Sequence, residues 1–320
     1  MFDTVKKFLY TLLFFISLPV IAQRKYAKEF SFYNDNDLYT STYQDRYYTN
    51  GMFFSYRYLA NNDNSTIEKK IFEFQIGHKM YTPHKATVDQ KTDHDRPFAA
   101  YLYGSFGFHN FYSNNSALKI SAQIGVIGPS ALGWELQDLI HDIYGFKKAI
   151  GWKYQIANAF AFNLNSNYKK TLFADTKNTF DITWNNNFRL GTVFTDISTG
   201  LYTRIGFKPL QKIVNSIAFN SNLNNKNTNY NNEAEVFFFV NPMIHYVLYD
   251  ATIQGSFLND NSMITYDVKP IKFTTQFGIR FTSNRFNFGY IVNLHTKKLK
   301  SLRVPNTNFY GTIILNYQFN

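Results

Sequence analysis

Apolar and polar residues alternate along most of this chain, and the alternation is clearest at the C-terminus. From residue 309 to residue 319 the sequence FYGTIILNYQF has apolar residues at every second position, with mostly polar residues between them. A period of two is the period of a β-strand, whose side chains point alternately to opposite faces. Aromatic residues at both ends of a span of ~11 residues are typical of a membrane-crossing strand. The pattern predicts one face in lipid and the other in a polar lumen.

The same alternation predicts twelve strands. Their approximate ranges are 28–35, 49–60, 70–81, 99–113, 117–128, 158–173, 180–192, 195–207, 233–250, 272–282, 286–297 and 308–319. An even number is what a closed bacterial barrel requires. We therefore predict an all-β fold, a twelve-stranded antiparallel transmembrane β-barrel, as a single domain over residues 23–320. Asn-rich connectors such as 61–64 and 220–232 are predicted to be solvated turns or loops.

Residues 131–145 have helical rather than strand periodicity. Pro129 ends the preceding strand, Ser130 is the expected N-cap and Gly145 the expected C-terminal stop. The apolar residues that share one arc of this helix are Leu136, Leu139, Ile140, Ile143 and Tyr144. Because the wall of a barrel consists of strands, the helix must lie in an extracellular loop or across the mouth.

The same helix carries the strongest candidate for a general base. His141 and Gln137 are one turn apart on the flank of the apolar face. The opposite side, which we expect to be solvated, carries Glu135, Asp138 and Asp142. The alternative for His141 is a histidine on the helix surface that faces water. Two other histidines, His245 and His295, are better explained as lumen-facing strand residues.

The N-terminus has the features of a secretory signal peptide. Lys6 and Lys7 precede the apolar run 8–20, which is too short for the ~20 residues of a membrane-spanning helix. We predict cleavage after residue 22; an uncleaved anchor is the alternative. The chain also has 34 Phe, 24 Tyr, no Cys and a net charge of +11. This composition disfavours a disulfide-rich secreted domain and suits a membrane rich in lipid phosphates. Export argues against nucleic acid as a partner.

A cluster of carboxylates and amides, Asn34 to Asp37, ends the first predicted strand. Oxygen atoms of this kind are ligands for Ca²⁺, and an Asn amide can stabilise an oxyanion. The alternative is an ordinary turn. Strand parity would separate Asp35 and Asp37 from Asn36, so a joint role requires the strand to end by then. The sequence has no Gly-x-Ser-x-Gly motif of a serine esterase.

Three blocks of residues together resemble the lipid A 3′-O-deacylases of the LpxR type, over essentially the whole chain after the signal peptide. The blocks are Asn36-Asp37 with Asp45-Arg46-x-Tyr48-Thr49-Asn50-Gly51; Asp95-Arg96-Pro97-Phe98-Ala99 with Tyr101; and Gly128-Pro129-x₃-Gly133-x₃-Gln137-x₃-His141-x₃-Gly145, followed by Gly151-Trp152-x₂-Gln155. The third block is the most specific. One departure is Asp35, where the family usually has Glu.

The resemblance implies an enzyme of the bacterial outer membrane that removes the 3′-linked acyloxyacyl group from lipid A, the lipid anchor of lipopolysaccharide, with the help of Ca²⁺. It implies a site near the outer leaflet, between the barrel wall and a loop helix. His141 would be the general base that activates water, and Asp37 would help to hold Ca²⁺. Asn36 would help to stabilise the oxyanion, and Thr49 and Gln137 would position these groups.

Basic residues near the blocks are candidates for binding substrate phosphates or sugar carboxylates. They are Arg46, Lys79 and Arg96, with Lys147 and Lys148 close to the helix. For each of them the alternative is a solvated or interface-anchoring residue. The terminal strand resembles the signal that barrel-assembly machinery recognises, although Asn320 follows the last Phe. We expect a monomer.

Two other functions fit parts of the pattern. An outer-membrane phospholipase would share the barrel, Ca²⁺ and ester chemistry, but such enzymes usually rely on a serine beside a histidine. A porin or adhesin would leave the helix and the Asn/Asp cluster as plain loops. A twelve-stranded barrel has little room for a wide pore, which argues against a porin.

Overall fold

The computed structural model describes residues 25–320 except 41–45, 63, 86 and 146. The predicted signal peptide, residues 1–22, lies outside the described residues. Among those that are described, no helix is long and apolar enough to cross a bilayer.

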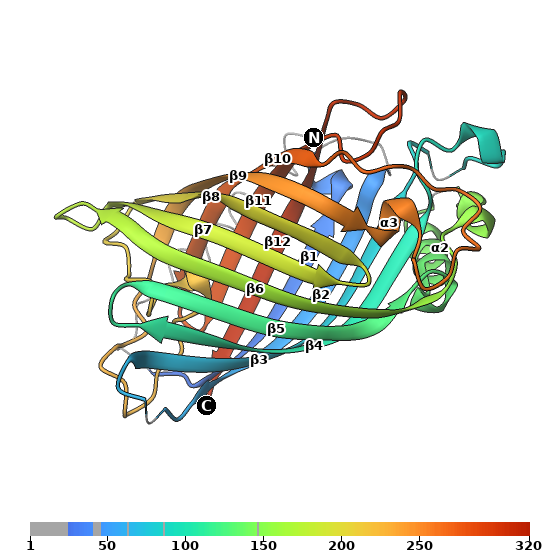
Figure 1. Ribbon diagram of the computed structural model, residues 1–320. Coiled ribbons are helices and arrows are strands. Elements are labelled where there is room, and N and C mark those ends of the chain that lie inside the picture. Colours follow the sequence, from blue (N-terminus) through green and yellow to red (C-terminus); the bar gives the residue numbers. More distant parts are fainter. Residues whose placement is uncertain (1–24, 41–45, 63, 86, 146) are drawn as a thin grey trace.

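Twelve antiparallel strands form a closed barrel in which β1 pairs with both β2 and β12 (Figure 1). The strands are β1 (Lys28–Asn36), β2 (Tyr47–Ala60), β3 (Ile67–Thr82), β4 (Ala99–Tyr112), β5 (Ser116–Ile127), β6 (Ala159–Ala174), β7 (Phe180–Gly191), β8 (Phe194–Gly206), β9 (Val236–Asp250), β10 (Ile271–Ser283), β11 (Phe286–Thr296) and β12 (Thr307–Phe319). Short helices lie between them: η1 (Asp37–Thr40), η2 (Lys91–Asp93), η3 (Pro129–Ala131), α2 (Gly133–Tyr144), η4 (Gly151–Tyr154), η5 (Ile217–Phe219) and α3 (Ala251–Gln254). The predicted fold class is confirmed.

The two faces of the wall differ as the alternation predicts. Outward-facing side chains are large and apolar, and many are exposed, such as Phe54, Phe106 and Phe160. Inward-facing side chains are mainly polar, and the predicted lumen residues His245 and His295 do line the interior. Because exposed apolar side chains are stable only against lipid, the outer face is the membrane-facing one.

The two ends of the barrel carry different connections. We call the end where β1 begins and β12 ends the terminal end, and the opposite end the loop end. Most connections at the terminal end are short, whereas long segments at the loop end carry α2 and α3 (Figure 1). The exception at the terminal end is residues 207–235, between β8 and β9.

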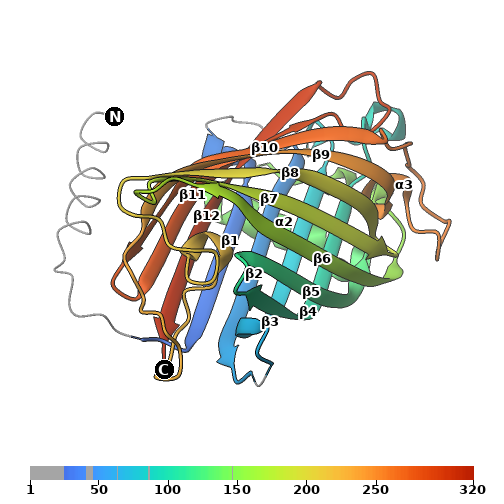
Figure 2. The same cartoon turned by 60° about the vertical axis from the view of Figure 1, so that its left-hand side comes forward.

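Residues 207–235, here called the interior segment, fold into the terminal end of the barrel (Figure 2). Ile217, Phe219 and Leu223 are buried in a core with inward-facing side chains of the wall. The Lys69 ammonium donates to the Ser221 carbonyl at 2.7 Å and to Asn224 Oδ1 at 3.0 Å. The prediction that 220–232 is solvated is therefore wrong for its first half. A polar lumen supplies hydrogen bonds to asparagines, so a polar tract can be buried there.

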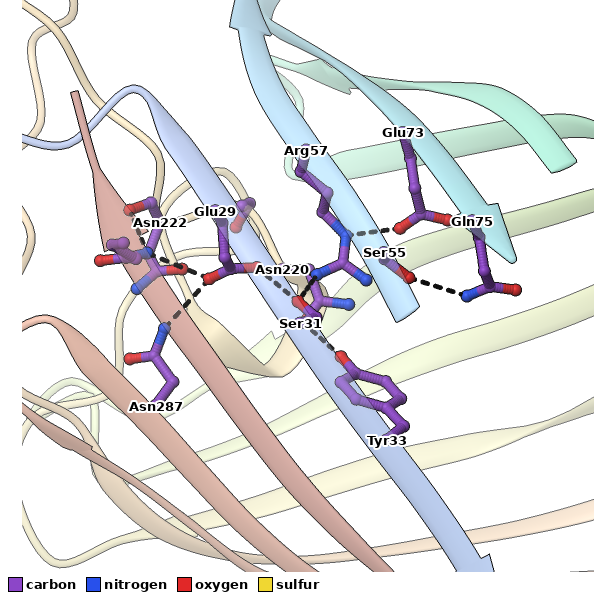
Figure 3. Close-up of polar contacts among 12 residues, drawn as sticks. Glu29, Ser31, Tyr33, Ser55, Arg57, Glu73, Gln75, Asn220, Asn222 and Asn287 are labelled. Atoms are coloured by element: carbon purple, nitrogen blue, oxygen red, sulfur yellow. Dashed lines mark hydrogen bonds and ion pairs between the residues drawn. The ribbon is translucent and has the colours of Figure 1, made fainter. Parts of the chain in front are cut away.

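Buried charges lie beside the interior segment (Figure 3). Arg57 donates to Glu29 at 2.7 Å, to Ser31 Oγ at 2.5 Å, and also pairs with Glu73. Lys119 contacts the other oxygen of Glu73 at 2.5 Å. At the terminal end of the lumen, the buried charges thus stabilise one another mainly through ion pairs.

Candidate active site

The helix α2 begins after an unusual turn. Gly128 has φ of 95° and Leu132 lies in the left-handed region with φ of 58°. The preceding 3₁₀ turn contains Ser130, and no side chain caps α2, so the predicted Ser130 cap is wrong. Gly145 ends the helix in the left-handed conformation, as predicted, and its N–H donates to the His141 carbonyl.

The helix lies against the outside of the wall. A Cβ at Gly133 would be only 2.5 Å from the Cβ of Ala100 and from the Trp152 ring, so the helix touches β4 directly. Ala100 and Met80 share a buried cluster with Trp152, whereas their strand neighbours Tyr101 and Lys79 point to the interior. Because neighbouring residues of a strand face opposite sides, Ala100, Met80 and α2 are on the outer face.

The exposed side of α2 carries three large apolar residues together with the predicted solvated residues Glu135 and Asp142. Gln137 and His141 are buried, with 1% and 5% of their surfaces exposed. Trp134, Leu139 and Ile143 are exposed. The sequence pattern correctly separated Gln137 and His141 from Asp142, but part of the apolar face is exposed, as is typical of a helix that contacts lipid.

Two hydrogen bonds orient the buried side chains of α2. The Trp152 indole N–H donates to Gln137 Oε1 at 2.6 Å. His141 Nδ1 lies 2.6 Å from the Lys147 carbonyl oxygen. Since a carbonyl can only accept, Nδ1 carries the proton of the neutral ring, and the lone pair is on Nε2. That tautomer is the one a general base at Nε2 requires.

A row of outward-facing residues runs from β1 to this helix. In register across the sheet are Asn36, Asn50, Met80 and Ala100. Thr49 lies in the β2 irregularity between Tyr48 and Asn50, and its hydroxyl is 2.6 Å from that of Thr82. The register therefore places Asn36 and Asn50, from the first sequence block, in the same row as Ala100, which α2 contacts.

Asn50 is a candidate that the sequence reasoning did not assign. It is only 4% exposed, and its Oδ1 has no hydrogen-bond partner among the described residues. A buried oxygen without a donor is costly in a fold and is commonly completed by a ligand, ion or water. The sequence signal that could have identified Asn50 is its position in the first block, between Thr49 and Gly51.

Asp37 lies at the rim, where β1 has ended. Asn36 is the last residue of β1 and is paired with both neighbouring strands, so only Asp37, the first residue of η1, is freed from strict alternation. Asp37 is 3% exposed and its Oδ2 accepts from the Arg46 N–H at 2.7 Å. Asn36 Oδ1 accepts from the Leu38 N–H at 2.8 Å.

A Ca²⁺ ion at this place would have few charged ligands. Within the described ranges, no three His, Cys, Asp or Glu side chains gather as a metal site. Asp37 would supply a carboxylate, and Asn36, Asn50 and backbone carbonyls are neutral oxygens of the kind Ca²⁺ also accepts. The unpaired Asn50 Oδ1 fits such an ion.

The predicted substrate-binding residues are not gathered around α2. Lys79 points into the lumen, on the other side of the wall. Arg96 is buried and donates to the Tyr47 and Thr252 carbonyls at 3.2 and 2.9 Å. These bonds connect its loop to the start of β2 and to α3. Arg46 is half-buried beside Asp37, with its guanidinium 5.8 Å from the Tyr47 ring centre.

A closed, twelve-stranded barrel with an apolar outer face defines the class of transmembrane β-barrels of bacterial outer membranes. Residues 8–319 match the family model described as Outer membrane protein LpxR, and the chain belongs to this family. As a member, it is an outer-membrane protein that modifies lipid A.

One solved structure agrees with the fold over most of its length. LpxR from Salmonella typhimurium has 20% sequence identity and a TM-score of 0.71, covering 91% of this chain and 100% of that chain. The β domain of the Bordetella autotransporter BrkA has 6% identity and a TM-score of 0.43, covering 92% and 99%. No curated protein sequence matches the chain.

Proposed function

We propose that this protein is a lipid A 3′-O-deacylase that hydrolyses the 3′-linked acyloxyacyl ester from the outer leaflet. The observation that carries the proposal is that His141 is buried on α2, a helix whose first turn packs against Ala100 on the outer face of the wall. A base in that position can meet an ester that arrives from the membrane, whereas a base in the lumen cannot. The family also supports this substrate.

The loop end would face the outside of the cell. In bacterial barrels the short turns are periplasmic and the longer loops extracellular, and most connections at the terminal end are short. Lipid A lies in the outer leaflet, next to the loop end. The exposed residues Trp134, Leu139 and Ile143 would then sit among its acyl chains.

In this mechanism His141 Nε2 removes a proton from water, which attacks the ester carbonyl without an acyl-enzyme. The tetrahedral intermediate then collapses, the bond between the acyl carbon and the 3′ oxygen breaks, and the imidazolium of His141 returns the proton to the leaving sugar oxygen. The contact between Nδ1 and the Lys147 carbonyl holds the required tautomer. Gln137, fixed by Trp152, supports the position of His141 one helical turn away. Asn36 would donate its amide N–H to the oxyanion. Asp37, with neutral oxygens such as that of Asn50, would hold Ca²⁺, which polarises the carbonyl when bound.

The test is mass spectrometry of lipid A from a Gram-negative host that expresses the full chain. Wild type should remove one 3′-acyloxyacyl unit. His141→Ala should lower the rate by about 10²–10⁴-fold, the usual contribution of a general base. Asp142→Ala is the matched control, because Asp142 is an exposed residue of the same helix and its loss should leave activity unchanged.

The same samples separate the alternatives. A phospholipase would leave lipid A intact and release fatty acids from glycerophospholipids. A porin or adhesin would change neither lipid. For the metal, EGTA should abolish deacylation and added Ca²⁺ should restore it; full activity in EGTA would remove Ca²⁺ from the mechanism.

A further inference from the structure

The lumen contains a polar cavity that the proposed reaction does not use. Its volume is about 560 Å³, and inward-facing side chains from most strands line it. It lies inside the wall, whereas His141 and α2 lie outside.

Three lysines line this cavity without a counterion. In the part of the chain that the structure describes, the ammonium groups of Lys79, Lys272 and Lys298 make no hydrogen bond or ion pair. Lys272 is 9% exposed. The other two meet only aromatic rings: Lys79 is 5.4 Å from the Phe194 ring centre, and Lys298 is 5.9 Å from that of Tyr48. Other cations of the cavity are paired, as in Lys119 with Glu73 and Arg189 with Asp196.

The nearby carboxylates are already engaged. Asp35 accepts from the Tyr48 hydroxyl at 2.7 Å and from the Thr312 hydroxyl at 2.6 Å. Asp196 pairs with Arg189. Asp250 accepts from the Thr252 N–H and hydroxyl at 3.0 and 2.6 Å. None of these carboxylates forms an ion pair with the three lysines.

One buried and two half-buried ammonium groups that line the same cavity without ion pairs favour an additional negative charge beyond the carboxylates nearby. The state of Lys298, which lies beyond the end of β11, illustrates the cost. Burial, reinforced by the charge of Lys272, holds the pKa of Lys298 well below its usual value. An anion in the cavity would provide both the charge and the acceptors.

We propose that the lumen binds a phosphate-type oxyanion between Lys79, Lys272 and Lys298. Each ammonium offers three donors and a compact charge, which suits the several oxygens of a phosphate. The site is separate from the α2 site and does not depend on the deacylase function. The phosphate is either free in solution or part of a lipid headgroup.

The test is thermal unfolding of the full chain in a neutral detergent, with phosphate compared with chloride at equal ionic strength. Phosphate should raise Tm by several degrees in a concentration-dependent manner. Lys298→Met and Lys272→Met should each weaken phosphate binding at least tenfold. Without phosphate, neither variant should have a lower Tm than wild type, because each loses an amino group that makes no hydrogen bond or ion pair with the described residues.

Lys300→Met is the matched control, since Lys300 is an exposed lysine of the same loop. It should keep the full response to phosphate. A second arm adds phosphatidic acid to the micelles; stabilisation by this lipid alone, lost in Lys272→Met, would identify a headgroup as the bound phosphate. An equal phosphate effect in wild type and both Met variants, or no effect of either phosphate source in wild type, would overturn the proposal.

Discussion

Arg57 illustrates how single residues keep a polar lumen folded. Its guanidinium is 2% exposed and is shared by Glu29 and Glu73, whose carboxylates are also buried. Such a set is stable because every charge has an oppositely charged partner with good geometry. Removing one member leaves the others uncompensated, and this penalty is larger than the net contribution of the pairs themselves.

Replacing Arg57 by Met should therefore lower the free energy of unfolding by about 3–5 kcal/mol. Urea unfolding of the detergent-solubilised barrel would measure this change. Arg303→Met is the control, because Arg303 is an exposed loop residue whose loss should have no measurable effect. Equal stability of Arg57→Met and wild type would mean that water already screens this network.

Asn50→Ala should reduce deacylation at least tenfold while the barrel stays folded. The reason is that its buried Oδ1 has no partner among the described residues, and that Asn50 is paired across the strands with Asn36 of the proposed site. The control is Asn110→Ala, since Asn110 is another strand asparagine with an unpaired buried Oδ1, but at the terminal end. Lipid A mass spectrometry of both variants would decide; similar losses in both would assign Asn50 a structural role.

At the scale of the element, the sequence predicted α2 but not its orientation. The 3.6-residue period and the stop at Gly145 are local properties, so both could be inferred. Which face is buried depends on the surroundings, and a helix beside lipid exposes its apolar side. For Asn36 and Asp37, the alternation of strand side chains predicted that a joint role needs the strand to end, and β1 does end at Asn36; their joint role stays a prediction. The position of Lys79 inside the wall and of α2 outside required the three-dimensional register.

Ile143→Asp should impair activity in membranes more than in detergent. Ile143 is 71% exposed on the apolar face of α2, so a charge there opposes contact with acyl chains without removing a buried group. Rates on lipid A in vesicles and in mixed micelles can be compared, with Asp142→Asn as the control. An equal loss in both systems would show that the substitution damages the helix itself.

At the scale of the whole molecule, alternation alone predicted all twelve strands, with each end within three residues of that observed. This succeeds because lipid on one side and a polar lumen on the other impose the same period on every strand. The interior segment could not be predicted in the same way. Its asparagines resemble those of a solvated loop, and only the structure reveals the side-chain partners of residues such as Asn220 and Asn224 inside the barrel.

The interior segment should make the barrel a poor conductor of ions. Replacing residues 212–231 by a short turn should raise single-channel conductance in planar bilayers well above that of wild type. The β-sheet signal in circular dichroism checks that the variant has folded. A high conductance of the wild-type chain would instead indicate that the segment leaves an open path.

The same segment touches both strands of the seam where the barrel closes. Tyr33 of β1 donates to Asn220, 187 residues away, and Gln318 of β12 donates to the Asn222 carbonyl, 96 residues away. A direct seam contact, Gln318 to Glu29, spans 289 residues. Because the interior segment contacts both β1 and β12, it would hold the two edge strands close to each other before they pair. This lowers the chain entropy that is lost when the barrel closes. We therefore expect the variant without residues 212–231 to acquire its heat-resistant, compact form more slowly than wild type in a refolding time course; equal rates would mean that the edges find each other unaided.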